Sequence, residues 1–344
     1  MSLRAVLVGA GAMGAQWLDA VAASPDVELA AVVDLDGAAA ARAARDRVPW
    51  ATTLSAVADG ADFVIDATVP AAHFDITACA LRLGLPVLGE KPLTSNLPQA
   101  LSLAALSELT GTLFAVSQSR RFELGLAAFK KQIVALGTVG SLTTEFYRGP
   151  RFGGFRETME HPLLLDMAIH AFDTARFLLD DEPVRVYCDA YNPPWSWYAG
   201  DASANAVFRF ASGARYSYTA SWCSTGYDTS WNGNWHAHTA AGTASWDGDL
   251  AGPASSLQET ISASLAAFVA ALRSGQRPPT RVHRNVLSLA MVLCAVESAS
   301  TGQPVLVDDA LAAAHAAAVA AAPPDVAAVL RGWPSVRAGL LETG

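Results

Sequence analysis

The stretch that decides the fold of the first part of the chain is LRAVLVGAGAMG, at residues 3–14. Residues 3–8 are almost all aliphatic, which is typical of a strand buried on both faces of a parallel sheet. Gly9, Gly11 and Gly14 follow as a GxGxxG pattern. In a strand-to-helix turn, the first glycine allows the tight bend, the second lets a diphosphate approach the backbone, and the third allows close packing of helix on strand. The stretch therefore predicts a dinucleotide-binding turn.

A helix-prone run begins at Ala12 and Met13, so its first backbone N–H groups would face the diphosphate. Asp34 ends the second strand-like run, residues 28–34, and lies 20 residues beyond Gly14. A carboxylate at that place accepts hydrogen bonds from an adenine ribose diol and repels a 2′-phosphate. No arginine follows Asp34 directly, so the sequence favours NAD over NADP. The alternative is an ordinary turn with a solvated aspartate.

The first 120 residues continue as alternating strands and helices. Strands separated by helices indicate a doubly wound parallel sheet, a Rossmann-type α/β domain. Further strands are expected at residues 62–66, 86–89 and 113–116, with helices near residues 71–83 and 97–109.

Beyond Phe122 the pattern changes. Residues 184–247 are rich in Ser, Thr, Tyr and Trp and contain several turn signals, which predicts strands without crossover helices. The second part is therefore expected to be α+β, with one open, mainly antiparallel sheet covered by helices on one side. Its expected helices span residues 124–136, 161–179, 257–273 and 284–300, and further strands are expected at residues 141–148 and 304–307. We expect an NAD-binding domain at residues 1–121, an α+β substrate and oligomerisation domain at 122–310, and an Ala-rich tail at 311–344.

Composition narrows the class of protein. The chain is 52% hydrophobic and 16% charged, which excludes intrinsic disorder. Its 23 basic and 32 acidic residues give a net charge of −9, which argues against a nucleic-acid partner and against docking on an anionic membrane. The four cysteines are far apart and form no CxxC pair, as in reduced cytosolic proteins. No signal-peptide pattern is recognisable, so a cytoplasmic location is expected.

Lys91 lies in the sequence Gly-Glu-Lys-Pro at the end of a predicted strand, residues 89–92. Ligands of open α/β sheets bind beyond the carboxyl ends of the strands. An ammonium group there can stabilise negative charge on a reacting oxygen. The alternative is a surface lysine in a loop.

Asp166 and His170 are spaced four residues apart in a predicted helix and would share a face. Imidazole beside a carboxylate is a suitable proton acceptor. A capping or packing pair is the alternative. A metal site could also be drawn from these two residues with His161, His236 and His238, but the spacing fits no standard zinc pattern, and no metal is expected.

Together these features resemble the glucose–fructose oxidoreductase/inositol dehydrogenase family, Gfo/Idh/MocA, over almost the whole chain. The resemblance rests on the order and spacing of short motifs: the glycine turn at residue 9, Thr68 and Pro70 after a strand, His73, Glu90-Lys91-Pro92, and Asp166-x-x-x-His170 followed by Asp173.

The resemblance implies that Lys91 is the catalytic lysine, and that Asp166 and His170 are the acid and the general base. It also implies that Thr68, Pro70, His73, Glu90 and Lys91 contribute to the cofactor site. The chain departs from the family at residues 160–165, where EHPLLL stands in place of a frequent glycine-rich run. That run borders the substrate, so no particular substrate follows from the resemblance.

The leading hypothesis is an NAD-dependent dehydrogenase that oxidises a secondary hydroxyl of a sugar, cyclitol or related polyol, or reduces the ketone. Two alternatives stay open: an NAD-binding sensor or scaffold without turnover, and a lyase or hydrolase that retains NAD. A homodimer or homotetramer is expected through the open face of the second sheet. That face is expected to carry, in part, the aromatic residues Phe208, Phe210, Tyr216 and Tyr218.

Overall fold

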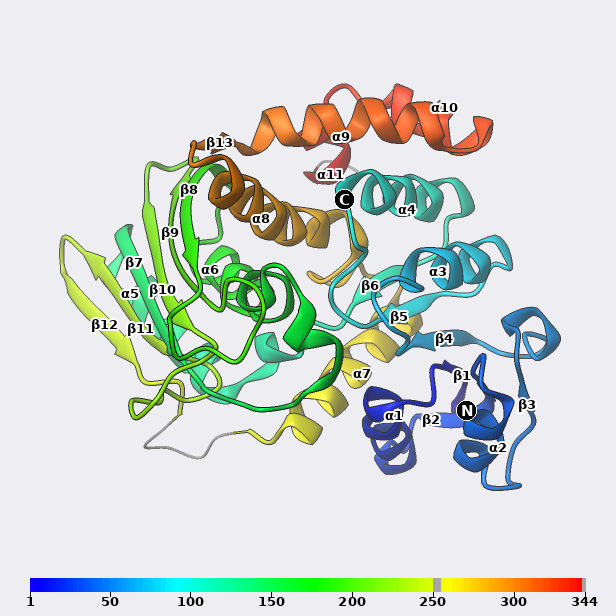
Figure 1. The fold of residues 1–344 in the computed structure, drawn as a ribbon. Coiled ribbons are helices and arrows are strands. Elements are labelled where there is room, and N and C mark those ends of the chain that lie inside the picture. Colours follow the sequence, from blue (N-terminus) through cyan, green and yellow to red (C-terminus); the bar gives the residue numbers. More distant parts are fainter. Residues whose placement is uncertain (250–254, 342–344) are drawn as a thin grey trace. The chain divides into compact units, whose positions relative to one another are not determined.

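The structure, a computed structural model, describes residues 1–249 and 255–341. The chain forms two compact units (Figure 1). The first contains Met1–Ser119, Ser256–Val286 and the segment that starts at Ala312. The second contains Arg120–Ser255 and Leu287–Leu311.

The first unit is built on a six-stranded sheet with the order β3-β2-β1-β4-β5-β6, and all its strand pairs are parallel. This is the strand order of a Rossmann fold, so the predicted doubly wound sheet is confirmed. The strands are β1 (Leu3–Val8), β2 (Val27–Val33), β3 (Trp50–Ala51), β4 (Phe63–Asp66), β5 (Val87–Gly89) and β6 (Phe114–Val116). The helices of this sheet are α1 (Ala12–Ala23), α2 (Gly37–Ala44), α3 (His73–Arg82) and α4 (Leu97–Thr110).

Helix α7 (Leu257–Ser274) also belongs to the first unit. Its apolar face joins the core between the sheet and α1, and the rings of Phe63 and Phe268 lie 5.4 Å apart. A capping box formed by Ser256 and Glu259 begins the helix. The expected assignment of this helix to a contiguous domain of residues 122–310 was therefore wrong. Its amphipathic pattern shows that one face is buried, but not which partner buries it.

The alanine-rich end of the chain is helical, as α9 (Val307–Ala321), α10 (Pro324–Gly332) and α11 (Val336–Leu341). Helix α10 packs against α4. The indole N–H of Trp333 donates to both carboxylate oxygens of Glu108, at 3.1 and 3.3 Å. Arg82 and Asp325 form a second, more exposed link. These contacts cover α4, which explains why most of its residues are buried.

The second unit contains a seven-stranded sheet with the order β12-β11-β7-β10-β9-β8-β13. Its strands are β7 (Val139–Tyr147), β8 (Pro183–Tyr191), β9 (Ser203–Phe210), β10 (Arg215–Ser221), β11 (Asn234–Thr239), β12 (Gly242–Trp246) and β13 (Val305–Leu306). Only β7 and β10 pair in parallel, so the predicted mainly antiparallel sheet is confirmed. Its helices include α5 (Leu124–Leu136), α6 (Ile169–Leu179) and most of α8 (Val282–Thr301).

The prediction that four aromatic residues lie on the open face of this sheet was wrong. Phe172 of α6 packs against Phe208, Tyr216 and Tyr218 on the covered face of the sheet. Phe210 lies on the same face of β9 as Phe208, and all four predicted residues are buried. The alternation of each strand instead turns mainly polar residues outward, with Tyr187, Tyr191, Val207 and Leu306 as the large exposed apolar or aromatic side chains.

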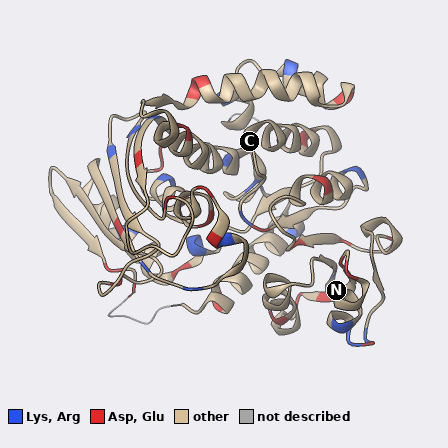
Figure 2. Cartoon of the chain, viewed as in Figure 1, with Lys and Arg blue, Asp and Glu red and all other residues tan. Residues whose placement is uncertain are grey.

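In the described part of the chain, only α8 is long and apolar enough to cross a membrane, judged by length and composition. Most of that apolar stretch is buried inside the protein, as expected of a core helix. The four cysteines are free thiols, three of them buried. Acidic and basic residues are scattered along the ribbon among long uncharged stretches (Figure 2).

Candidate functional site

The glycine turn lies at the carboxyl end of β1. Gly9 has a φ of +98°, and a Cβ atom on it would lie 2.6 Å from the carbonyl oxygen of Ala67. A Cβ atom on Gly14 would collide with the carbonyl oxygen of Gly9. At Gly11, the residue that caps α1, a Cβ atom would meet nothing within 4 Å. The turn is therefore closely packed beneath Gly9 and Gly14 and open at Gly11, as a diphosphate site requires.

Ala12 and Met13 form the first turn of α1, as predicted. Ala12 is exposed, whereas Met13 is partly buried and packs against the core of the first unit. The N-cap residue Gly11 has no side chain that could accept a hydrogen bond from the first turn of the helix. The N–H groups of that turn are therefore not capped by a side chain. The free N–H groups of a first helical turn favour an anion there.

Asp34 directly follows β2 and lies against the glycine turn. Its carboxylate accepts hydrogen bonds from the backbone N–H of Ala10 at 2.7 Å and of Asp36 at 2.9 Å, one on each oxygen. Each carboxylate oxygen can accept a further bond. The side chain is thus held next to the diphosphate position and keeps acceptors for the two hydroxyls of a ribose. The glycine turn and Asp34 therefore fit the diphosphate and the ribose of NAD.

The loops after β4 and β5 meet through His73. One ring nitrogen of His73 lies 2.7 Å from the carbonyl oxygen of Pro92, and the other lies 3.1 Å from that of Thr68. Pro70 is joined to the second loop by the hydroxyl of Ser95, which donates to its carbonyl oxygen. The carboxyl ends of parallel strands share one edge of a sheet, so these loops lie at the edge that carries the glycine turn.

Glu90 is buried at this edge, and the peptide that follows it, Lys91–Pro92, is cis. The indole N–H of Trp17 donates to Glu90 at 2.9 Å, and the backbone N–H of Lys91 donates at 3.2 Å. Burial raises the pKa of the Glu90 carboxyl, while the positive charge of Lys91 and the bond from Trp17 oppose that rise. Glu90 therefore anchors the backbone that carries Lys91.

Sequence reasoning missed two parts of this edge. Trp17 is fully buried in α1, and nothing in its helical pattern indicates a carboxylate partner. Asp66, the fully buried last residue of β4, accepts from the hydroxyls of Thr68 at 2.6 Å and Thr77 at 3.2 Å. The sequence did contain a signal for Asp66, because an acidic residue at the end of an otherwise apolar strand indicates a polar role at the sheet edge.

In the second unit, Asp166 and His170 belong to one continuous helical segment. Leu163–Ala168 has π-helical hydrogen bonding and runs directly into α6, whereas a single α-helix was expected from residue 161. A π-turn inside a helix is frequent at functional sites. Asp166 is buried and His170 is half-buried.

Arg156 is a partner of Asp166 that the sequence did not indicate. Its Nε–H donates to the Asp166 carboxylate at 2.6 Å. The guanidinium comes from the short 3-10 turn Gly154–Thr158, ten residues before its partner in an irregular segment. A nearby cation favours the ionised form of a carboxylate.

Asp173 has a structural role. Arg121 donates two hydrogen bonds to its carboxylate, at 2.6 and 2.9 Å, and the hydroxyl of Ser288 donates a third at 2.6 Å. Arg121 lowers the pKa of the Asp173 carboxyl against the opposing effect of burial. Asp173 therefore ties α6 to the segment before α5 and to α8.

The histidines proposed for a metal site are dispersed. His161 is buried near Asp201, with 3.3 Å between Nδ1 and the carboxylate. His236 and His238 are exposed on β11 and contact the hydroxyls of Ser245 and Thr243 on β12. Within residues 1–249 and 255–341, no three His, Cys, Asp or Glu side chains gather in a way that could hold a metal ion.

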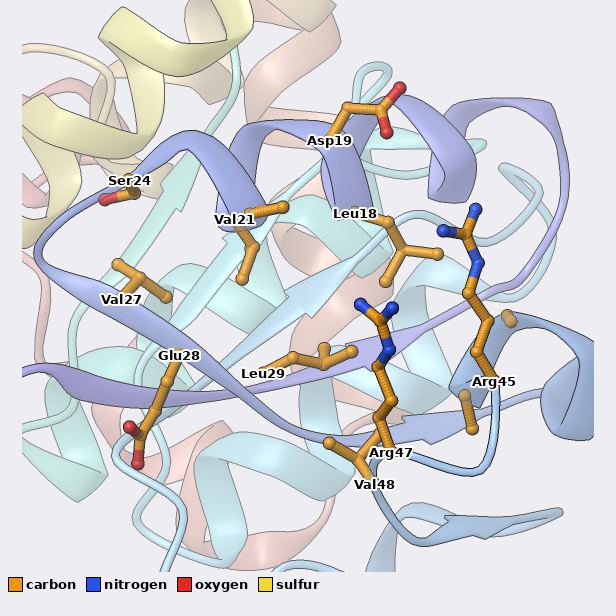
Figure 3. A pocket seen from close by; sticks show the side chains of 13 residues that line it. Leu18, Asp19, Val21, Ser24, Val27, Glu28, Leu29, Arg45, Arg47 and Val48 are labelled. Carbon is orange, nitrogen blue, oxygen red and sulfur yellow. The ribbon is translucent and has the colours of Figure 1, made fainter.

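A hollow of about 290 Å³ opens elsewhere on the first unit, between α1, β2 and the end of α2 (Figure 3). Val27, Glu28 and Leu29 of β2 contribute to its wall. It therefore lies at the amino end of β2, opposite the end that carries Asp34. Its lining mixes apolar side chains with Asp19, Arg45 and Arg47 and includes none of the predicted site residues.

Comparison with known proteins agrees with this geometry. Residues 3–118 match an oxidoreductase family described by its NAD-binding Rossmann fold, and residues 131–244 match the GFO/IDH/MocA C-terminal domain. A crystal structure of myo-inositol dehydrogenase from Lactobacillus casei, in complex with NAD(H) and myo-inositol, superposes with a TM-score of 0.79. That superposition covers 89% of this chain and 97% of the other, at 18% identity, and so shows a shared fold.

Curated relatives are matched over part of their length. An uncharacterised protein, y4oX, of Sinorhizobium fredii is 27% identical over 64% of this chain and 66% of its own length. Inositol 2-dehydrogenase of Corynebacterium glutamicum is 32% identical over 54% of this chain and 56% of its own length. The chain thus spans between about half and two thirds of these relatives. With both domain matches in chain order and the glycine turn, Asp34 and Lys91 at one sheet edge, the chain belongs to the GFO/IDH/MocA family of NAD-binding oxidoreductases.

Proposed function

We propose that this protein is an NAD-dependent dehydrogenase that oxidises a secondary hydroxyl of a sugar, cyclitol or related polyol, or reduces the corresponding ketone. The observation that carries the proposal is the edge of the first sheet, where the open glycine turn, the Asp34 carboxylate and Lys91 follow the ends of parallel strands. The inositol 2-dehydrogenase relative, matched over about half its length, supports a polyol as the substrate.

The chemistry is divided between the units. In the proposal, the reaction needs Lys91 of the first unit and both Asp166 and His170 of the second. His170 accepts the hydroxyl proton, Asp166 supports it, and Lys91 stabilises the negative charge that develops on the oxygen. Bound NAD would accept the carbon-bound hydrogen as hydride. That cofactor would be held by Gly9, Gly11, Gly14 and Asp34. The cofactor site would also be lined by Thr68, Pro70, His73 and Glu90.

The cofactor assignment rests on Asp34. Its carboxylate already faces the turn and would meet the extra phosphate of NADP with like charge. We expect NADH to bind at least about tenfold more tightly than NADPH, about 1.4 kcal/mol. Fluorescence titration of both reduced cofactors measures this ratio, and equal dissociation constants would refute the role of Asp34.

We further propose a two-fold symmetric dimer or tetramer through the open face of the second sheet, centred on the exposed Tyr187, Tyr191 and Val207. Light scattering at micromolar concentration gives the mass. A monomeric mass for the wild-type chain would contradict this assembly.

The test of activity is NADH formation by the pure protein with a panel of inositols, sugars, amino sugars and sugar acids. A dehydrogenase releases one NADH for each molecule oxidised. Turnover without net NADH would instead support a lyase or hydrolase that retains NAD. Binding of NADH with no chemistry on any compound would support a sensor.

A further inference from the structure

Two arginines near Asp166 differ from the structural arginines of the same unit. Arg121 and Arg176 each form a two-bond pair with one carboxylate, Asp173 and Glu182 respectively. Such pairs are typical of arginines that hold elements together. Arg120 and Arg156 lack this arrangement, although both are largely or partly buried.

Arg156 uses one donor on Asp166. Its Nε–H makes the 2.6 Å bond, and no other hydrogen bond of this guanidinium occurs among residues 1–249 and 255–341. A guanidinium has five N–H donors, so four remain available. The side chain is 31% exposed, so these donors can reach a ligand.

Two phenyl rings orient this guanidinium. Its central carbon lies 4.8 Å from the ring centroid of Phe155 and 5.6 Å from that of Phe152. Both rings are more than half exposed. An arginine over aromatic faces keeps its plane fixed, and exposed faces of this kind can also pack on the C–H surface of a polyol.

Arg120 is the second cation. It lies in the 3-10 turn Ser119–Phe122, and its side chain forms neither an ion pair nor a hydrogen bond within the part of the chain that the structure describes. Burial lowers its pKa to about 10, opposed by the negative charges of Glu123 and Asp166 and by Tyr218. It stays cationic at neutral pH, is half-buried, and lies close enough to Asp166 to interact with it electrostatically.

We infer that the polyol oxidised by this protein carries an anionic oxygen group, most simply a carboxylate, which binds the remaining N–H groups of Arg156 with the Arg120 charge nearby. The planar guanidinium would then bridge two carboxylates, that of Asp166 on Nε and that of the substrate on its terminal nitrogens. The bridge would place a positive charge between the Asp166 carboxylate and an acidic substrate. The inference rests on the proposed function and narrows its substrate class to sugar acids.

The test compares acids with matched neutral compounds. We would measure kcat/KM for glucuronate and galacturonate against glucose and galactose at saturating NAD, with glucose 6-phosphate to separate a phosphate from a carboxylate. In the wild-type protein, we expect kcat/KM to be at least tenfold higher for an acid than for its matched neutral sugar, and we call this quotient the acid-to-neutral ratio. Arg156→Gln should reduce that ratio by about 10- to 100-fold, the range expected for a hydrogen bond between charged groups. Arg156→Lys keeps the charge and should lose less.

Arg151→Gln is the matched control. Arg151 lies on the same segment, stacks on Trp197 at 4.0 Å and forms no contact with Asp166, so its loss should leave the ratio within about twofold. A preference for the neutral sugars, or an equal loss on both classes in Arg156→Gln, would overturn the inference and leave Arg156 as a positioning residue for Asp166. A phosphate preferred over the carboxylates would overturn the sugar-acid assignment.

A binding measurement separates failure of this inference from failure of the proposed activity. Calorimetric titration of the NADH-saturated protein with galacturonate needs no turnover. Binding by the wild-type protein that is lost in Arg156→Gln would support the anion site even if no compound produced NADH. Equal binding by both proteins, or binding by neither, would refute it.

Discussion

At the scale of single residues, Gly11 and Gly14 of the glycine turn should respond differently to substitution by alanine. In Gly14→Ala the new methyl group would press on the carbonyl oxygen of Gly9, so we expect the free energy of unfolding to fall by about 1–3 kcal/mol. In Gly11→Ala the methyl group meets no protein atom, so stability should stay within about 0.5 kcal/mol. NADH affinity should fall in both.

Denaturant unfolding and NADH titration on the two variants check this pair. A Gly11→Ala protein that binds NADH as well as the wild type would show that the diphosphate does not approach the backbone there. Equal stability of Gly14→Ala and the wild type would contradict the close packing of α1 on the turn.

Residues whose role depends on backbone conformation could be predicted from the sequence. Gly9 and Gly14 are fixed by the local requirements of a strand-to-helix turn, and Asp34 by its distance along the chain from that turn. Arg156 could not be predicted, because its contact with Asp166 depends on the path of an irregular segment with no periodic pattern. The bond between Trp17 and Glu90 joins residues 73 positions apart, one in α1 and one directly after β5, and it was missed because it depends on how those elements pack.

At the scale of elements, Asp173 holds α6 in place, and its contribution depends on pH. The pKa of its carboxyl is lowered in the folded protein, so the stability it provides is present above the pKa of the unfolded chain. That stability is lost as pH falls through the folded pKa. Asp173→Asn leaves the buried Arg121 unpaired and should cost about 3–5 kcal/mol at neutral pH.

Denaturant unfolding at pH 7 and at a pH near 3 measures this effect, with the exposed Asp59→Asn as the control. The difference between wild type and Asp173→Asn should shrink at the lower pH, because the wild-type carboxyl binds a proton more readily in the unfolded chain than in the folded protein. A difference that stays constant with pH would show that the pair with Arg121 is not its cause.

The C-terminal helices are predicted to stabilise the first unit through α4. Trp333 is 9% exposed, bonds to Glu108 and stacks with His315 at 6.0 Å between ring centroids. Trp333→Ala should lower the free energy of unfolding by about 3 kcal/mol, as for other large buried aromatic side chains. Arg331→Ala, an exposed change on α10, is the control and should change it by less than about 0.5 kcal/mol. Equal unfolding midpoints for the two variants would contradict this role.

Most elements could be predicted because hydrophobic periodicity is a local property. The residues of β1 and α4 are expected from the sequence to within a residue or two, and a mainly antiparallel sheet in the second unit is expected from its turn signals. The partner of an amphipathic face is not local, which explains why α7 was assigned to the wrong unit. The inward and outward faces of β9 and β10 were confused for the same reason. Their alternation separates aromatic from polar side chains, but it does not tell which of the two faces the helices cover.

At the scale of the whole molecule, the dinucleotide edge belongs to the first unit and the proposed acid–base pair to the second, and the family matches cover parts of both. The central claim is that His170 serves as the general base for a hydride transfer that depends on the cofactor site of the first unit. The two functions should therefore be separable: a change at His170 should affect turnover, whereas a change in the glycine turn should affect cofactor binding. Arg156 and Arg120 would add selectivity for acidic substrates to the second unit.

The most direct measurement is the rate of NADH formation by His170→Asn with a substrate identified on the wild-type protein, together with NADH titration of the same variant. We predict an NADH dissociation constant within about twofold of the wild type and a turnover number lower by about 10²–10⁴-fold, the usual contribution of a positioned general base. Turnover near the wild-type rate in a variant that binds NADH normally would contradict the account.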